Sequence, residues 1–236
     1  MKALRLKCFQ ETACYTKPFA SKVAETYPLP PYSTVKGMIH AVMNATELIP
    51  FSLSVQGDFE TRIVDYRKTY MVKKKGFAMP IIMDGLSSDV PVYDNKTMTS
   101  MPLYTHMLYN VNLIIHVRAE EDLLEKMLVA FQNNDQHLSL GRYEDLLRLD
   151  DVEIVELEEC EGAELTNNIY IPVYYLNENI SGIPYQLNWI YNIKDGLREW
   201  EKIKVKYVPK ATDIYDDAMT QTLYIDQEEN LVFWNV

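Results

Sequence analysis

The stretch Tyr27-Pro-Leu-Pro-Pro-Tyr-Ser-Thr-Val-Lys-Gly-Met-Ile-His-Ala-Val-Met-Asn-Ala45 governs how the rest of the chain is expected to fold. Its three prolines hold an extended approach, because each fixes its own φ and moves the preceding residue out of the α region. Ser33 or Thr34 is expected to cap the following helix through its hydroxyl. Apolar residues then recur at helical spacing, which predicts one buried stripe made of Val35, Met38, Ile39, Val42 and Met43.

The first turn of this helix carries Lys36, where the helix dipole does not favour a cation. A helix N-terminus with a lysine beside it can receive a phosphate group. The simpler interpretation is a rigid entry into an ordinary core helix, and the stretch alone leaves both open.

The composition indicates a globular protein without membrane spans. The chain has 236 residues, 47% of them hydrophobic, enough for one large core or two modest ones. No run of about 18 apolar residues occurs. Residues 3–10 alternate between polar and apolar, which predicts a strand rather than a signal peptide, with Arg5 and Lys7 on its polar face. Cys8, Cys14 and Cys160 form no C-x-x-C pair, so we expect reduced thiols, a cytoplasmic protein and no zinc site.

The net charge of −11 argues at first against a nucleic-acid partner, but the charge is distributed unevenly. Residues 1–80 carry 12 Lys and Arg against 6 Asp and Glu, a balance of +6, and residues 81–236 carry 11 against 28, a balance of −17. This asymmetry suggests that one region meets an anionic partner while another faces solvent or a basic partner.

The order of expected elements predicts an α+β fold. After the first strand and helix come strand segments at 53–56 and 59–72, a basic turn at 73–76, and an irregular, Pro- and Gly-containing excursion at 77–101. A strand at 104–117, a helix at 120–133 and a strand at 152–157 follow. This β-α-β, β-α-β order is typical of a ferredoxin-like (RRM-like) lobe, assigned to residues 1–160 with a protruding hairpin. Such a lobe leaves one sheet face open, which is where RRM sheets hold RNA.

The remaining residues, 161–236, are expected to form a small β-rich C-terminal lobe. Short strands are predicted at 169–175, 200–208, 222–226 and 231–236. From Asp150 to Glu164 there are eight acidic residues and no basic one, a pattern that favours a solvated edge over a metal site.

Hydrolytic motifs are absent from the sequence. The four histidines fall in no H-E-x-x-H pattern, and there is no G-x-S-x-G or P-loop. A metal-free ribonuclease needs only a general base and a cation near the scissile phosphate, so residue types alone leave that activity open.

A basic and aromatic segment lies along the second strand. Tyr66, Tyr70 and Phe77 are interleaved with six cations: Arg62, Arg67, Lys68, Lys73, Lys74 and Lys75. Cations neutralise phosphates and aromatic faces stack on unpaired bases, so the mixture suits single-stranded RNA. The alternative is a solvated strand whose Lys-rich turn prevents edge pairing.

Two segments together resemble a known family. The Pro-Pro-Tyr-Ser-Thr-Val-Lys-Gly stretch beginning at Pro30, and Leu138-Ser-Leu-Gly-Arg-Tyr-Glu-Asp-Leu146, resemble the CRISPR-associated RAMP superfamily. Within it the sequence is most similar to the Cas5 subunit of type I Cascade complexes, in the subtype I-B group. That family carries Pro-Pro-x-Ser-Thr/Ala-x-x-Gly followed by two hydrophobic residues, and later Leu-Gly-Arg-x-Glu-Asp.

The resemblance implies a ferredoxin-like lobe with a protruding thumb hairpin, placed at about residues 73–101. Family members hold the 5′ handle of the CRISPR RNA (crRNA) and contact the large and backbone subunits of Cascade, and through the assembled complex they can meet target DNA. The thumb closes over the guide. Carried over to this sequence, Ser33, Thr34, Lys36 and Gly37 would lie at the handle, with Arg142 near it or bracing its turn.

One departure from the family bears on catalysis. In the subtype I-C branch the subunit resembles a metal-free endoribonuclease with a Tyr and an adjacent Lys-His pair, and no Lys-His dipeptide occurs here. We therefore expect a non-catalytic, cofactor-free RNA-binding subunit. The alternatives are a metal-independent endoribonuclease that processes pre-crRNA and, because of the net acidity, a protein-interaction module without RNA contact.

Overall fold

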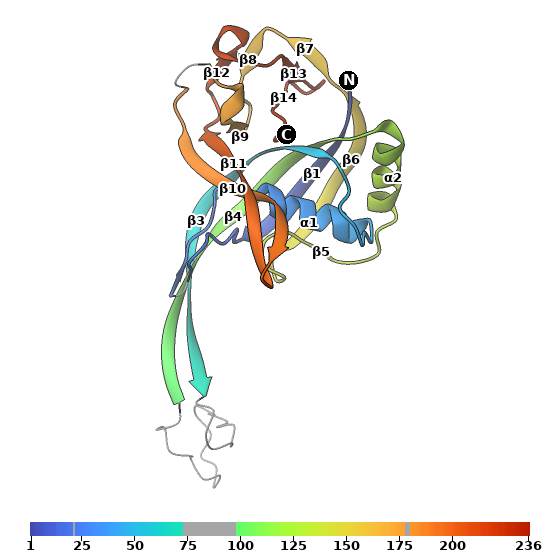
Figure 1. Ribbon diagram of the computed structural model, residues 1–236. Helices are drawn as coiled ribbons and strands as arrows, with labels where there is room; N and C mark the ends of the chain where they lie inside the picture. Colours follow the sequence, from blue (N-terminus) through green and yellow to red (C-terminus); the bar gives the residue numbers. More distant parts are fainter. Residues whose placement is uncertain (21, 73–97, 178–179) are drawn as a thin grey trace.

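The computed structural model describes residues 1–20, 22–72, 98–177 and 180–236, and it is an α+β structure dominated by one large sheet (Figure 1). The sheet has nine strands in the order β10-β11-β9-β3-β4-β1-β6-β5, with β2 beside β4. Its strands are β1 (Lys2–Ala13), β2 (Val23–Ala24), β3 (Ser52–Val72), β4 (Met98–Arg118), β5 (Leu138–Ser139), β6 (Leu146–Glu156), β9 (Asn168–Pro172), β10 (Ile183–Lys194) and β11 (Leu197–Val208).

Two α-helices, α1 (Tyr32–Val42) and α2 (Glu121–Gln132), share one core with the sheet. The predicted stripe of α1 is buried except for Met43, which follows the helix and is partly buried. Alternate residues of β1 and β3 point into the same core, namely Leu4, Leu6, Cys8, Leu53 and Val55. The predicted strands and both helices are therefore present, with the segments at 53–56 and 59–72 joined into β3.

The start of α1 differs from the prediction. Its N-cap is Pro31, which makes no side-chain capping bond, and the helix begins at Tyr32, so Ser33 and Thr34 lie inside the first turn. Pro31 also accepts hydrogen bonds through its carbonyl from the N–H groups of Thr34 (2.9 Å) and Val35 (3.2 Å). The fixed φ of Pro31 sets the helix entry in place of a hydroxyl cap.

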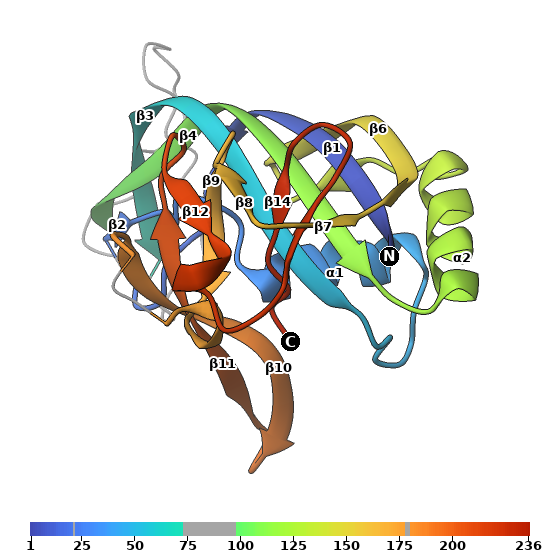
Figure 2. The same ribbon diagram turned by 90° about the horizontal axis from the view of Figure 1, so that it is seen from above.

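The short strands gather at the end of the molecule opposite the projecting β3–β4 ribbon (Figures 1 and 2). They are β7 (Glu158–Cys160), β8 (Gly162–Glu164), β12 (Asp213–Tyr215), β13 (Leu223–Ile225) and β14 (Leu231–Val232), accompanied by 3-10 turns at Val173–Tyr175 and Asp216–Ala218. The main sheet contains strands from both sides of residue 160, and the division into two lobes there stays a prediction.

The sheet face opposite the helices is covered over much of its area, which corrects the expectation of an open, RRM-like face. Gln56 donates to the carbonyl of Leu231 (3.1 Å), and Leu53 and Asn235 exchange two hydrogen bonds. Trp234 packs in a buried cluster with Ala3, Val155, Leu157 and Val232. The C-terminal segment thus occupies the surface on which an RRM would stack bases.

Under this cover lies a buried charged cluster. Arg5 was expected on the polar face of its strand, and it is only 3% exposed there and donates to Asp226 (2.9 Å), Glu228 (2.9 Å) and Glu153. Asp226 also accepts from His116 Nε2 (3.1 Å). Burial opposes ionisation of Asp226, but the bonds from His116, Asn230 and Arg5 outweigh it and hold its pKa well below the usual range.

His116 makes the fold sensitive to acid. Burial lowers the pKa of His116 and outweighs the opposing bond to Asp226, so the imidazole is neutral in the folded state. Below about pH 6.5 the unfolded chain binds a proton that the folded chain does not, and the free energy of unfolding should fall as pH falls, by at most about 1.4 kcal/mol per pH unit.

Urea unfolding between about pH 7.5 and 5.5 measures this slope. We expect His116→Gln to reduce it and the exposed His137→Gln to leave it unchanged. Equal slopes in the wild type and His116→Gln would contradict the assignment.

Strand β10 was missed by the sequence analysis. It forms a hairpin with β11 around Asp195-Gly196, both at positive φ (51° and 75°). An Asp-Gly pair between alternating segments is a strong hairpin signal, so this element was predictable.

Candidate nucleic-acid interface

The Gly-Arg turn at residues 140–145 is organised by the buried carboxylate of Asp145. This group accepts hydrogen bonds from the backbone N–H groups of Cys14 and Arg142, both at 2.9 Å. Gly141 has φ of +111°, and a Cβ there would lie 2.8 Å from the Asp145 carboxylate, so glycine is required. Gln10 closes the turn by donating to the carbonyls of Leu140 (2.9 Å) and Asp145 (3.0 Å).

The guanidinium of Arg142 is bound by carboxylates of this same turn. It reaches both Asp145 oxygens, Oδ2 from Nε (3.1 Å) and Oδ1 from Nη2 (2.6 Å), and Glu144 from Nη1 (3.1 Å). The hydrogen bond to Asp145 outweighs burial and raises the pKa of Arg142. Of the two roles expected for Arg142, the geometry gives it that of a brace.

The root of the β3–β4 ribbon lies beside this turn. Arg67 pairs with Asp65 (2.6 Å) and approaches Glu144 at 3.9 Å, so Arg67 and Arg142 share one carboxylate. Arg62 lies over the Phe59 ring, 5.6 Å from its centroid. The structure therefore brings two predicted cations, Arg67 and Arg142, to one place.

The predicted residues of the first helical turn form a second group. Lys36 Nζ lies 4.8 Å from the centroid of the Trp189 ring of β10, and burial lowers its pKa although Glu201 opposes the shift. Ser33 and Thr34 are half-buried, and their side chains make no hydrogen bond within the described part of the chain. Gly37 is exposed, and a Cβ there would meet nothing within 4 Å.

Two short segments, residues 14–15 and 26–29, connect the Gly-Arg turn with the first turn of α1. Tyr15 accepts at its carbonyl from the N–H of Tyr27 (2.8 Å), and its own N–H donates to Thr26 Oγ1 (2.9 Å). Tyr170 then fixes the proline segment by donating to the carbonyl of Leu29 (2.8 Å). The Gly-Arg turn and the helix entry are thus joined through residues 14–15 and 26–29.

With this geometry in view, the family can be assigned. Residues 3–217 match the family described as "CRISPR-associated protein (Cas_Cas5)". This chain belongs to the Cas5 family. The match covers most of the chain and confirms the resemblance to the Cas5 family that was drawn from the two motifs.

Solved structures share the fold of this Cas5 protein at low sequence identity. One, titled "CRISPR RNA-guided surveillance complex", has a TM-score of 0.57 and 15% identity and covers 92% of each chain. Another, a CRISPR protein from Archaeoglobus fulgidus, has a TM-score of 0.51 and 10% identity and covers 98% of each chain. No curated protein sequence matches the chain.

Of the other cations predicted for this Cas5 protein, Lys68 is exposed on β3, and Lys73, Lys74 and Lys75 lie outside the described residues. The sequence analysis missed further cations on β11, which its alternating Lys residues at 202, 204 and 206 could have indicated.

His40 and His116 have structural partners. His40 Nδ1 lies 2.8 Å from the carbonyl of Lys36, and its Nε2 accepts from the N–H of Ile49 (3.0 Å). His116 is buried beside Asp226. In the described part of the chain, no group of three His, Cys, Asp or Glu residues is arranged to hold a metal, and no helix there is long and apolar enough to cross a membrane.

Proposed function

We propose that this Cas5 protein is an RNA-binding subunit of a type I CRISPR surveillance complex, Cascade, and holds the 5′ handle of the crRNA. The observation that carries the proposal is the β3–β4 ribbon of a Cas5-family chain, which projects from the body as two strands alone (Figure 1). An isolated two-stranded ribbon is marginally stable in water, so one of this length implies a partner that covers it.

The ribbon has the side chains of a nucleic-acid surface. Val64 and Tyr66 are 56% and 57% exposed, and Tyr66 pairs with Tyr104 at a ring-centroid distance of 5.3 Å. Arg67 and Lys68 follow on the same strand. Cations for phosphates and rings for unpaired bases occur together. Most of the thumb predicted at residues 73–101 lies outside the described residues, and we propose that the β3–β4 ribbon, which ends at residue 72 and resumes at residue 98, belongs to a thumb that closes over the guide.

The exposed glycine of α1 supports a ligand at the helix entry. Glycine in a helix interior costs about 1 kcal/mol relative to alanine. No atom of the described chain requires the space at Gly37. Close approach of a ligand backbone explains why glycine stands there, next to the half-buried cation of Lys36.

The proposed lobe type rests on the sheet topology, and the proposed subtype rests on sequence motifs. Strand order β3-β4-β1-β6, with α1 between β1 and β3 and α2 between β4 and β6, supports a ferredoxin-like lobe. The subtype I-B assignment rests on the two sequence motifs. The large and backbone subunits of Cascade, and target DNA within the assembled complex, complete the proposed partners.

We propose that the subunit does not cut RNA. His40 has both ring nitrogens engaged, so it is a poor general base, and His116 is out of reach of solvent. We expect no cleavage of a repeat RNA by the purified protein with or without EDTA, and cleavage in the presence of EDTA would establish the metal-independent endoribonuclease instead.

Gly37→Ala should separate stability from function. Alanine is expected to raise the free energy of unfolding by about 0.5–1 kcal/mol, because it removes the glycine penalty from an exposed helix position. The same methyl group should obstruct the RNA backbone and reduce crRNA retention in a complex coexpressed with the large and backbone subunits by about tenfold.

The matched control is Gln132→Ala, an exposed change at the end of α2 that should leave crRNA retention at the wild-type level. Lys36→Gln should also lower retention, and its difference from the wild type should narrow as salt rises, because one fewer cation releases counterions. Full retention in both Gly37→Ala and Lys36→Gln would overturn the proposed handle site.

A further inference from the structure

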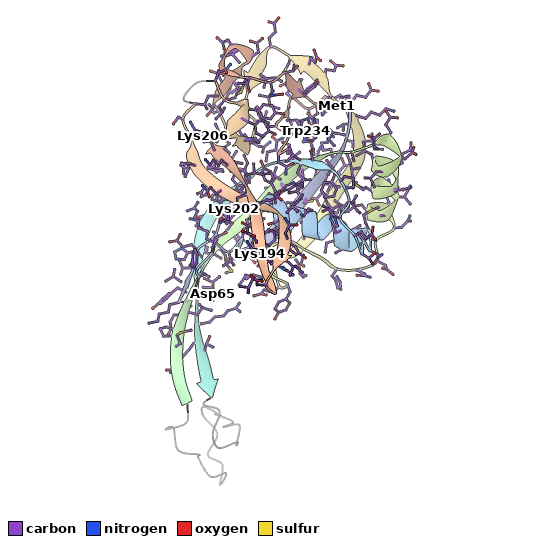
Figure 3. The ribbon with its side chains drawn as sticks, viewed as in Figure 1. Met1, Asp65, Lys194, Lys202, Lys206 and Trp234 are labelled. Atoms are coloured by element: carbon purple, nitrogen blue, oxygen red, sulfur yellow. The ribbon has the colours of Figure 1, made fainter. Side chains whose placement is uncertain are left out.

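The β10–β11 hairpin has two faces of different character. One face packs on the core through Leu187 and Val205, both fully buried. The other points to solvent, and the register places five residues of β11 on it in succession: Arg198, Trp200, Lys202, Lys204 and Lys206. Figure 3 shows Lys202 and Lys206 along the length of this strand.

This outer face concentrates positive charge on a chain whose net charge is −11. The acidic residues of β11, Glu199 and Glu201, alternate onto the other face, where Glu199 lies 3.9 Å from Lys194. Lys202 and Lys204 make no ion pair within the described part of the chain. Lys206 donates to the carbonyl of Ile180 (2.9 Å).

The spacing and the neighbours of these cations suit a phosphate backbone. Alternate residues of a strand lie about 6.6 Å apart, close to the interval between successive phosphates of an extended nucleic-acid strand. The cross-strand partners of Lys204 and Lys202 are Gln186 and Asn188, whose amides can donate to phosphate oxygens.

An aromatic pair ends the row of lysines. The rings of Tyr191 and Trp200 are 5.0 Å apart, and the guanidinium of Arg198 lies 4.5 Å from the Tyr191 centroid. Tyr191 is 38% exposed. Ring faces next to a basic track are the arrangement by which proteins bind unpaired bases.

We infer that the outer face of the β10–β11 hairpin is a second nucleic-acid-binding surface, which holds a single strand along Lys202, Lys204 and Lys206 with a base against Trp200. This surface is separate from the proposed handle site. Trp189, which contacts Lys36, points toward α1 from the opposite face of the same hairpin. An acidic peptide could pair with the lysines, but it has no bases to stack on the Tyr191–Trp200 pair.

Fluorescence anisotropy with the purified full chain tests the inference. The probes are unstructured oligouridylate RNA and oligothymidylate DNA of about 12 nucleotides and a duplex of the same length. The double variant Lys202→Gln/Lys204→Gln should bind the single strands about tenfold more weakly. It should also reduce the slope of log affinity against log salt by about 1.4, which is 0.7 for each lost cation.

Matched controls locate the effect. Lys2→Gln/Lys126→Gln makes the same charge change at β1 and α2 and should bind like the wild type. Lys36→Gln, which tests the handle site, should leave this binding intact, so failure of one site is distinguishable from failure of the other. Wild-type affinity in the Lys202/Lys204 variant, or an equal loss in the Lys2/Lys126 control, would overturn the inference.

Photo-crosslinking gives an independent readout. A probe carrying 5-iodopyrimidine should crosslink within residues 191–200, and Trp200→Phe should retain the crosslink better than Trp200→Ala. The RNA and DNA arms distinguish a guide strand from a target or displaced strand. Tighter binding of the duplex, displacement by polyglutamate of equal charge, or crosslinks confined to other segments would each contradict a single-strand site.

Discussion

Asp226→Ala is expected to lower the free energy of unfolding by about 3–5 kcal/mol, because it leaves the guanidinium of Arg5 in a buried site without its best partner. Arg5 is 3% exposed and Asp226 is 4% exposed. The same carboxylate accepts from His116 Nε2 and from the backbone N–H groups of Glu228 and Asn230, both at 2.9 Å. One substitution therefore removes an ion pair and leaves several buried donors unpaired.

Urea unfolding monitored by tryptophan fluorescence measures the loss. If Asp226→Ala does not fold, Asp226→Asn, which keeps an acceptor oxygen, should give an intermediate value. Arg5→Met in the Asp226→Asn background should recover part of the loss, because the uncompensated cation is gone. Asp150→Ala removes the partner of exposed Arg148 and should leave the urea midpoint unchanged. Similar midpoints for Asp226→Ala and Asp150→Ala would show that the cluster does not stabilise the fold.

This cluster also shows why part of the fold was outside the reach of sequence patterns. The alternation of residues 3–10 correctly predicts a strand, but it assigns Arg5 to a polar face by default. The partner that buries Arg5 lies 221 residues further along the chain. Local periodicity reports which residues share a face, and it carries no information on whether a distant segment covers that face.

The candidate site was likewise predicted only in part from the sequence. The Pro-Pro and Gly-Arg motifs identify two local structures, and both occur where the sequence places them. Their roles required the structure, since only the geometry shows that Arg142 is bound by Asp145 and that Lys36 rests on Trp189. The β10–β11 hairpin was within reach of sequence analysis through its Asp195-Gly196 turn and was missed.

The covered sheet face explains why the proposed nucleic-acid contacts lie on other elements of this protein. An RRM places RNA on its open face. Here the C-terminal segment covers that surface, with Trp234 packed in a buried cluster and Asp226 paired with Arg5 of β1. Basic and aromatic side chains are found instead on projecting elements, the β3–β4 ribbon and the β10–β11 hairpin, and at the entry of α1. We infer that this chain binds extended nucleic-acid strands through several small surfaces rather than through one sheet face.

Asp145→Ala should be the most damaging change at the candidate site. The backbone N–H groups of Cys14 and Arg142 would lose their acceptor, and each unpaired buried donor costs about 1–3 kcal/mol. The half-buried guanidinium of Arg142 would lose its bidentate partner as well. We expect the free energy of unfolding to fall by about 3–4 kcal/mol. Retention of crRNA should fall too, since the turn supports the root of the ribbon through Glu144 and Arg67.

Thermal unfolding tests the expected loss of stability. Retention of crRNA, measured at a temperature where the variant is folded, tests the expected loss of RNA binding. Asp135→Ala, an exposed aspartate in the loop after α2, is the matched control and should change neither. Arg142→Lys keeps the charge but cannot form the two-pronged bond to Asp145, so it should show a smaller loss of stability. If Asp145→Ala loses stability but retains crRNA fully, the turn supports the fold alone. If it matches Asp135→Ala in both measurements, the Gly-Arg turn has neither role.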